Sequence, residues 1–233
     1  MPMNTQYISD PTRTLVLACA TVIEEMQPLL PGGMQTRVFD FGLHVKPEVL
    51  HSTLQAAIDA VSGQFETILL GYGLCSMALV GIRANGCRLV APRVDDCIAM
   101  FLGSKAAYKA QSQKEPGTYY LTRGWIEVGD TPFLEHERNV QKLGRENADY
   151  VYRMMMGNYK RLALINTGQY ALDRCREYTR QAAEKFHLAF EEIPGSPALV
   201  RKMLYGPWDE EFVVLEPGES FKFEQFKRED EVV

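Results

Sequence analysis

Residues 67–75, TILLGYGLC, join a short run of apolar and β-branched residues to a glycine-rich turn that ends in a cysteine. Such a run is typical of a strand that is covered on both faces of a sheet. The glycines of the turn allow a tight passage out of the strand and a close approach of the backbone to a ligand. This stretch therefore predicts a buried parallel strand with a ligand-binding turn at its carboxyl end.

Three other segments repeat the pattern of an apolar strand followed by a small or cysteine-bearing turn. They are TLVLACA at 14–20, RLVAPRVDDC at 88–97 and RLALINTGQ at 161–169. Segments with helical spacing of apolar residues, such as 47–62, lie between the strands. This alternation predicts an α/β fold, with a mostly parallel sheet, helices on both of its faces and βα pseudo-repeats.

One segment interrupts the alternation. Residues 116–132 begin with Pro-Gly and continue with aromatic residues and further glycines. We expect a small irregular insert here, a strand or hairpin, in place of a βα unit. No linker or low-complexity stretch divides the 233 residues, so we expect a single α/β domain over 1–233.

Composition and charge exclude two classes of partner. The net charge of −5 argues against a nucleic-acid binder, which needs a basic face. No apolar run approaches the roughly 18 residues of a membrane-spanning helix. The polar segment 1–14 has no apolar signal core. We therefore expect a cytoplasmic protein that binds neither nucleic acid nor membrane.

Three of the five cysteines follow the ends of predicted strands. Cys19, Cys75 and Cys97 would meet at the carboxyl edge of a parallel sheet, where ligands bind. Three thiolates can hold zinc with one open position, or an iron–sulfur cluster of the 4Fe–4S type with one open iron. Packing as small apolar residues is the alternative. Cys87 and Cys175 are expected to be structural.

Glycine and charged residues beside these cysteines are further candidates. The turn of Gly71, Tyr72 and Gly73 resembles half of a dinucleotide-binding fingerprint, but its third glycine is missing and a plain turn is the favoured reading. It is the candidate cofactor-binding element.

Catalytic candidates come from the segment before Cys97 and from the insert. Arg93 would bind an anionic substrate, and Asp95 or Asp96 would transfer a proton. An Asp N-cap with solvated charges is the alternative reading. Glu127, in the GWIE segment of the insert, is the fourth catalytic candidate, on a segment that would form a lid wall; a satellite hydrophobic cluster is the alternative, and the favoured, reading of this segment.

The segments LACATVIEEM, GYGLCS, RLVAPRVDDCIAMFLGS and YYLTRGWIE together resemble the family labelled domain of unknown function 1638, over residues 13–215. Its members look like cytoplasmic proteins of anaerobic bacteria and methanogenic archaea, often encoded beside corrinoid-dependent methyltransferases. The resemblance implies that the motif cysteines correspond to Cys19, Cys75 and Cys97. It also implies a role in corrinoid-linked one-carbon metabolism.

Three functions remain open from the sequence, and whether the protein is an enzyme is not decided. The leading hypothesis is a metal- or iron–sulfur-dependent enzyme or accessory protein that acts on a small-molecule substrate. The second is an enzyme without metal that uses Cys97 as its nucleophile. The third is a non-catalytic binding or chaperone module for a corrinoid methyltransferase system, with an apolar docking patch near residues 154–156.

Overall fold

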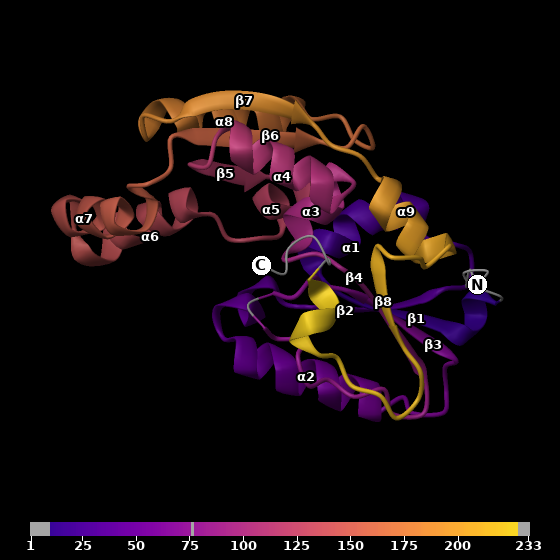
Figure 1. Ribbon diagram of the computed structural model, residues 1–233. Coiled ribbons are helices and arrows are strands. Elements are labelled where there is room, and N and C mark those ends of the chain that lie inside the picture. Colours follow the sequence, from indigo (N-terminus) through magenta and orange to yellow (C-terminus); the bar gives the residue numbers. More distant parts are fainter. Residues whose placement is uncertain (1–9, 76, 228–233) are drawn as a thin grey trace.

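The computed structural model describes residues 10–75 and 77–227 (Figure 1). The first nine residues of the polar N-terminal segment lie outside the described residues. In the described part the strands form two sheets, one in the order β2-β1-β3-β4-β8 and one in the order β5-β6-β7. The strands are β1 Thr14–Cys19, β2 Gln35–Phe39, β3 Thr67–Gly71, β4 Arg88–Pro92, β5 Thr118–Leu121, β6 Arg161–Asn166, β7 Ala189–Pro194 and β8 Phe212–Leu215.

Helices surround both sheets. The α-helices are α1 Ala20–Met26, α2 Pro47–Asp59, α3 Cys97–Leu102, α4 Lys105–Lys114, α5 Arg123–Glu127, α6 Pro132–Leu143, α7 Arg145–Met156, α8 Asp173–Lys185 and α9 Ala198–Tyr205. On the first sheet, α2 covers one face while α1 and α9 lie on the other (Figure 1). The α/β class with a mostly parallel sheet is therefore confirmed.

The first sheet positions the predicted site. Strands β2, β1, β3 and β4 run parallel, and every residue of β1 is buried, as its unbroken apolar run predicts. Ala18 of β1 lies opposite Gly71 of β3, so these two strands end at the same edge. Strand β8 pairs antiparallel with β4 and closes the other side of the sheet.

The second sheet begins in the segment that the sequence predicts to be an irregular insert. Strand β5 pairs in parallel with β6 and is followed directly by α5, so this part of 116–132 is a βα unit. Helix α5 begins after Thr122, because the hydroxyl of Thr122 accepts a hydrogen bond from the backbone N–H of Trp125 at 3.3 Å and caps the helix. The turn residues around β5 mimic a hairpin, but its pairing partner lies 40 residues downstream.

The remaining helices attach to the second sheet. Helix α8 packs against β6 and β7, and α6 and α7 form a hairpin that extends away from the sheet (Figure 1). Within the described residues no helix is both long and apolar enough to cross a membrane.

A buried carboxyl group on α1 joins the two sheets. Glu25 is 2% exposed, and its Oε2 accepts hydrogen bonds from Thr167 Oγ1 at 2.8 Å and Gln169 Nε2 at 3.1 Å. Burial raises the pKa of this carboxyl. The apolar residues of both sheets belong to one continuous buried cluster. The single-domain assignment for 1–233 remains a prediction.

Candidate functional site

The strand order reverses direction between β1 and β3. From β1 the chain crosses to β2 on one side, whereas β3 leads to β4 on the other. Ligands of open α/β sheets bind at such a switch point, outside the carboxyl ends of the strands. Cys19 is the last residue of β1 and precedes α1, and Cys97 is the first residue of α3. Cys75 lies in the turn after β3.

Backbone hydrogen bonds hold the turn after β3 against the turn after β4. Leu74 N donates to Val94 O at 2.8 Å, and Cys75 N donates to Asp95 O at 3.0 Å. Gly73 permits this approach, because a Cβ there would lie 2.7 Å from Val94 O. The two turns therefore form one unit that carries two of the three cysteines.

The three thiols are close enough to perturb one another. Cys19 and Cys97 are buried and Cys75 is partly exposed. Burial raises the pKa of all three thiols. The charge of Cys19 raises the pKa of Cys75 further, and the charges of Cys19 and Cys75 raise that of Cys97. The thiols predicted from separate strand ends therefore come together in the fold.

No metal geometry is already formed at these positions. Within residues 10–75 and 77–227, no group of three or more His, Cys, Asp or Glu side chains has the arrangement that holds a metal ion. The thiol of Cys19 is instead 3.1 Å from Thr21 Oγ1. The thiols are thus neighbours in the fold without being at the spacing of metal ligands.

Tyr72 forms one wall of the thiol site. Its side chain is 1% exposed, and its hydroxyl has no hydrogen-bond partner among the described residues. Burial raises the pKa of Tyr72, and the charges of Cys19, Cys75 and Cys97 raise it further. The hydroxyl therefore lies within electrostatic range of all three thiols. An unpaired buried hydroxyl is costly in a folded protein unless something uses it.

An aromatic cluster continues this wall. The ring of His44 lies 5.8 Å from that of Tyr72 and stacks on Phe41 at 5.3 Å. Phe41 in turn contacts Trp125 of α5 edge-on, with centroids 6.1 Å apart. Burial lowers the pKa of His44, which favours its neutral imidazole. The segment predicted to form a lid thus contributes Trp125 to the surroundings of the site.

Of the four predicted catalytic residues, Asp96 lies nearest the thiols. Its carboxylate caps α3 by accepting from Ile98 N at 2.9 Å, and its charge raises the pKa of both Cys75 and Cys97. Burial raises the pKa of Asp96 itself. A buried carboxyl group with a raised pKa beside thiols has the chemistry of a proton donor or acceptor.

The other three candidates face elsewhere. Arg93 donates to Phe212 O of β8 at 3.3 Å. Asp95 is exposed and lies 4.0 Å from the amine of Lys105. Glu127 accepts from Arg123 Nε at 2.7 Å on the surface of α5. Their catalytic roles remain predictions.

Cys87 and Cys175 lie apart from the three-thiol site. Burial and the charge of Asp59 raise the pKa of Cys87 to about 11. Burial also raises the pKa of Cys175, which senses the charge of Glu127. Neither thiol enters the electrostatic surroundings of the site cysteines, so both serve as matched controls.

The sequence prediction missed a second cavity, between α7 and the end of α8. Its charged residues on α7 leave a signal in the sequence. Arg145, Asp149 and Arg153 follow one another at intervals of four and therefore share one helical face. The partners across this cavity come from α6 and from the residues after α8, which no local pattern connects to α7.

Comparison with known proteins identifies a family and nothing narrower. No curated protein and no solved structure matches the chain. The profile of the family described as protein of unknown function (DUF1638) matches residues 38–204. That segment contains Cys75 and Cys97, whereas Cys19 precedes it. Because the match covers most of the chain, this protein belongs to the DUF1638 family.

Proposed function

We propose that this protein is a metal- or iron–sulfur-dependent enzyme or accessory protein whose ligands are Cys19, Cys75 and Cys97. The observation that carries the proposal is the mutual electrostatic effect of these thiols at the carboxyl edge of a parallel sheet. The β1–β3 switch point is where a small-molecule substrate of such a fold binds.

The raised pKa values favour a metal site over a free nucleophile. A thiol whose pKa is raised by burial and by neighbouring thiolates is neutral near pH 7 and attacks poorly. A bound cation reverses this balance, because metal ligation displaces the thiol proton and compensates the accumulated negative charge. Three interacting thiols are therefore better suited to sharing a cation than to separate nucleophilic roles.

Metal binding requires the three thiols to move closer to one another than they are in the described structure. Cys75 is the best placed to move, because it lies in a turn and is the most exposed of the three thiols. It also has a left-handed backbone, with φ of 45°, that a non-glycine residue rarely adopts. Such strain is commonly retained at ligand sites.

Three protein thiolates leave one coordination position open. On zinc this position would hold water or a substrate thiol, and on a 4Fe–4S cluster it would leave one iron exposed. Tyr72 and Asp96 border the thiols and would supply a hydroxyl and a carboxyl group to a substrate bound there. We propose a small metabolite of corrinoid-linked one-carbon metabolism as that substrate.

The first test is the metal and sulfide content of protein purified without oxygen, compared with two variants. Cys97→Ala removes a proposed ligand, and Cys87→Ala makes the same change at another buried cysteine. We expect about four iron and four sulfide, or about one zinc, in the wild type and in Cys87→Ala. Cys97→Ala should lose this content while retaining a wild-type circular dichroism spectrum.

Two outcomes contradict the proposal. One is the absence of iron and zinc from all three proteins. The other is metal that persists equally in Cys97→Ala, which would place the ligands elsewhere. Rapid alkylation of Cys97 at neutral pH in metal-free protein would support the nucleophile alternative instead.

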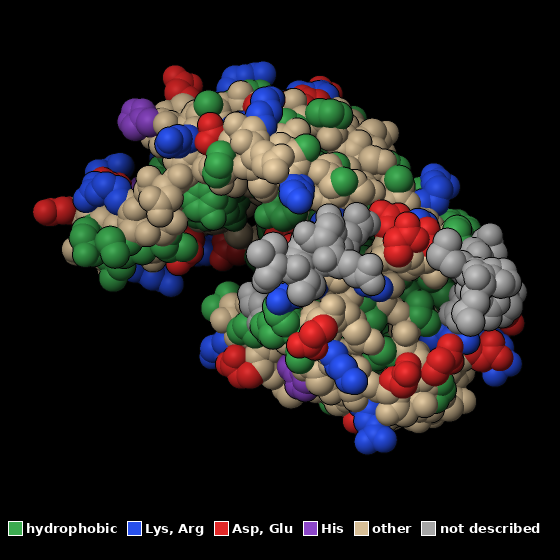
Figure 2. All heavy atoms as spheres, viewed as in Figure 1, with side chains coloured by type: hydrophobic (Ala, Val, Ile, Leu, Met, Phe, Trp, Pro, Cys, Tyr) green, Lys and Arg blue, Asp and Glu red, His purple; other side chains and the backbone are tan. Residues whose placement is uncertain are grey.

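A second candidate function is a binding or chaperone module for a corrinoid methyltransferase system. It is favoured by exposed apolar side chains on the α6–α7 hairpin, where hydrophobic residues reach the surface (Figure 2). Met154 is 72% exposed and Tyr150 is 60% exposed. Co-sedimentation with a purified corrinoid methyltransferase tests this candidate, and Met154→Glu should abolish the complex. A complex that is insensitive to this change would exclude the hairpin as the docking surface.

A further inference from the structure

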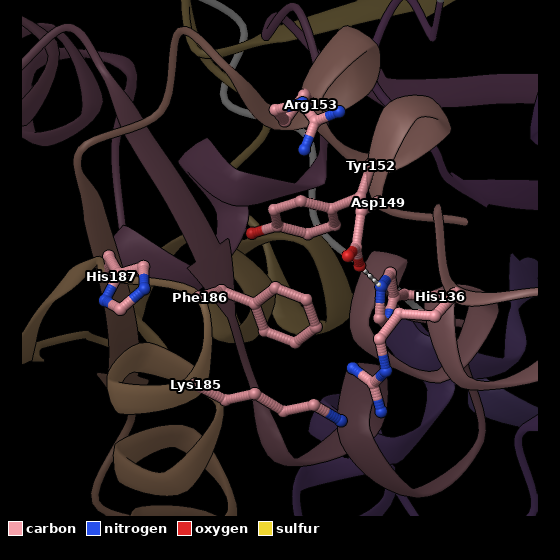
Figure 3. Close-up of a pocket in the computed structure, with 8 residues that line it drawn as sticks. His136, Asp149, Tyr152, Arg153, Lys185, Phe186 and His187 are labelled. Carbon is pink, nitrogen blue, oxygen red and sulfur yellow. Dashed lines mark hydrogen bonds and ion pairs between the residues drawn. The ribbon is translucent and has the colours of Figure 1, made fainter. Parts of the chain in front are cut away.

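A cavity of about 360 Å³ lies between the α6–α7 hairpin and the end of α8, away from the three-thiol site. Its size is within the range of roughly 300–1,000 Å³ that is usual for small-molecule sites. Side chains from α6, from α7 and from the residues that follow α8 converge on it (Figure 3). Three separate segments of the chain therefore build this cavity.

The lining of the cavity carries more positive than negative side chains. Arg145 and Arg153 of α7 and Lys185 of α8 contribute three positive charges, whereas Asp149 contributes the one carboxylate. Lys185 is paired with Glu137 at 3.0 Å.

The two arginines are available to a ligand. No carboxylate of the described chain lies within ion-pair distance of Arg145 or Arg153. Asp149, which stands between them on α7, is already engaged by His136, whose Nε2 lies 2.7 Å from Asp149 Oδ1 (Figure 3). The cavity thus retains an excess of positive charge after its internal ion pairs are formed.

His136 forms part of the cavity wall and is hydrogen-bonded to Asp149. Its side chain is 3% exposed, and its Nδ1 is buried with no hydrogen-bond partner among the described residues. The role of His136 in the cavity is therefore structural: it bonds Asp149 and packs in the wall.

Aromatic and strained residues fix the shape of the cavity. The rings of Tyr152 and Phe186 stack with centroids 4.2 Å apart, and the edge of His136 packs against Phe186 at 5.0 Å. His187 follows them with a left-handed backbone, φ 56°, which is uncommon for a residue other than glycine. These ring contacts fix the aromatic wall of the cavity and the position of His136 within it.

We propose that this cavity binds the phosphate group of a small phosphorylated metabolite. Arginine forks match phosphate oxygens in pairs, and Arg145 and Arg153 supply two such forks to one cavity. The proposal is independent of the metal at the three-thiol site.

Isothermal titration calorimetry with three probes tests the proposal. The probes are inorganic phosphate, glycerol 3-phosphate and succinate, the last as a dicarboxylate of equal charge. We expect both phosphates to bind saturably and succinate to bind more weakly. If inorganic phosphate binds as tightly as the ester, the free ion is the ligand and the metabolite assignment falls.

Variants locate the binding. Arg145→Gln and Arg153→Gln alter exposed residues, so the fold should persist. Each should weaken phosphate binding about 10-fold or more, because each removes a charge-assisted donor pair. Arg174→Gln makes the same change at an exposed arginine at the opposite end of α8 and should leave binding unchanged.

Three results would overturn the assignment. The first is no saturable heat with either phosphate at millimolar concentrations. The second is equal weakening by Arg174→Gln and by the two cavity variants, which would indicate attraction to the overall charge. The third is tighter binding of succinate than of either phosphate.

Discussion

Gly73→Ala would add one methyl group at the point where the turn carrying Cys75 crosses the turn before Cys97. A Cβ at this position would lie 2.7 Å from Val94 O and 2.9 Å from Asp96 N. Both are backbone atoms, so no flexible side chain can rotate away. Ordinary contact begins at 3.4 Å, and the two turns must therefore separate by about 0.7 Å, the difference between these distances.

A separation of this size breaks the hydrogen bonds that hold the turns together. The bonds from Leu74 N to Val94 O and from Cys75 N to Asp95 O measure 2.8 and 3.0 Å and would lengthen beyond hydrogen-bond range. Overpacking costs about 1–3 kcal/mol, and a buried polar group left unpaired costs about as much. We expect the free energy of unfolding to fall by about 2–4 kcal/mol.

Urea denaturation followed by tryptophan fluorescence measures this change. Gly32→Ala is the matched control, because no heavy atom lies within 4 Å of its added Cβ. The control should leave stability within about 0.5 kcal/mol of the wild type or raise it slightly. A Gly73→Ala protein as stable as the wild type would refute the packing of the two turns described above.

Three further changes test buried polar groups. Tyr72→Phe should raise the free energy of unfolding by about 1 kcal/mol in urea melts, since it removes a buried hydroxyl without a described partner. A lower free energy of unfolding would instead show that the hydroxyl has a hydrogen-bond partner. The raised pKa of Glu25 means that its contribution to stability is present below its unfolded value of about 4.5 and is lost as pH rises through the folded pKa. Glu25→Gln should therefore gain stability over the wild type as pH rises from acidic to neutral, and a pH-independent difference between their urea midpoints would contradict this. Arg161→Ala should lower the free energy of unfolding by about 3 kcal/mol in thermal melts, because Arg161 is 4% exposed and pairs with Glu191. Arg180→Ala, at an exposed ion pair, should lower it by less than about 1 kcal/mol. Equal losses in the two variants would refute this distinction between buried and exposed pairs.

Local patterns were sufficient to predict most of the individual elements of this fold. The apolar runs at β1, β3, β4 and β6 indicate buried parallel strands because both of their faces are covered. The start of α2 at Pro47 follows from the proline, whose missing N–H costs nothing in the first turn of a helix. The placement of the three cysteines at strand ends was visible for the same local reason.

Local sequence patterns could not predict which strands belong to which sheet. The turn after β6 resembles those after β1, β3 and β4, yet β6 lies in the second sheet, so Thr167 meets Glu25 and not the thiols. Strand β8 pairs antiparallel beside β4 and supplies the carbonyl of Phe212 to the guanidinium of Arg93, a pairing between residues 119 positions apart. Hydrophobic periodicity reports that a strand is buried and does not identify its neighbour.

The sequence therefore determined the α/β class, the elements and the cysteines that end their strands, because these depend on residues within a few positions of each other. Only the tertiary structure decided which groups meet. The convergence of the thiols depends on the adjacency of β1, β3 and β4. The cavity with its basic residues depends on α7 packing beside the end of α8, which places Arg153 and Lys185 on the lining of the same cavity. Both are set by long-range packing, in which the burial of apolar surface selects the arrangement of whole elements.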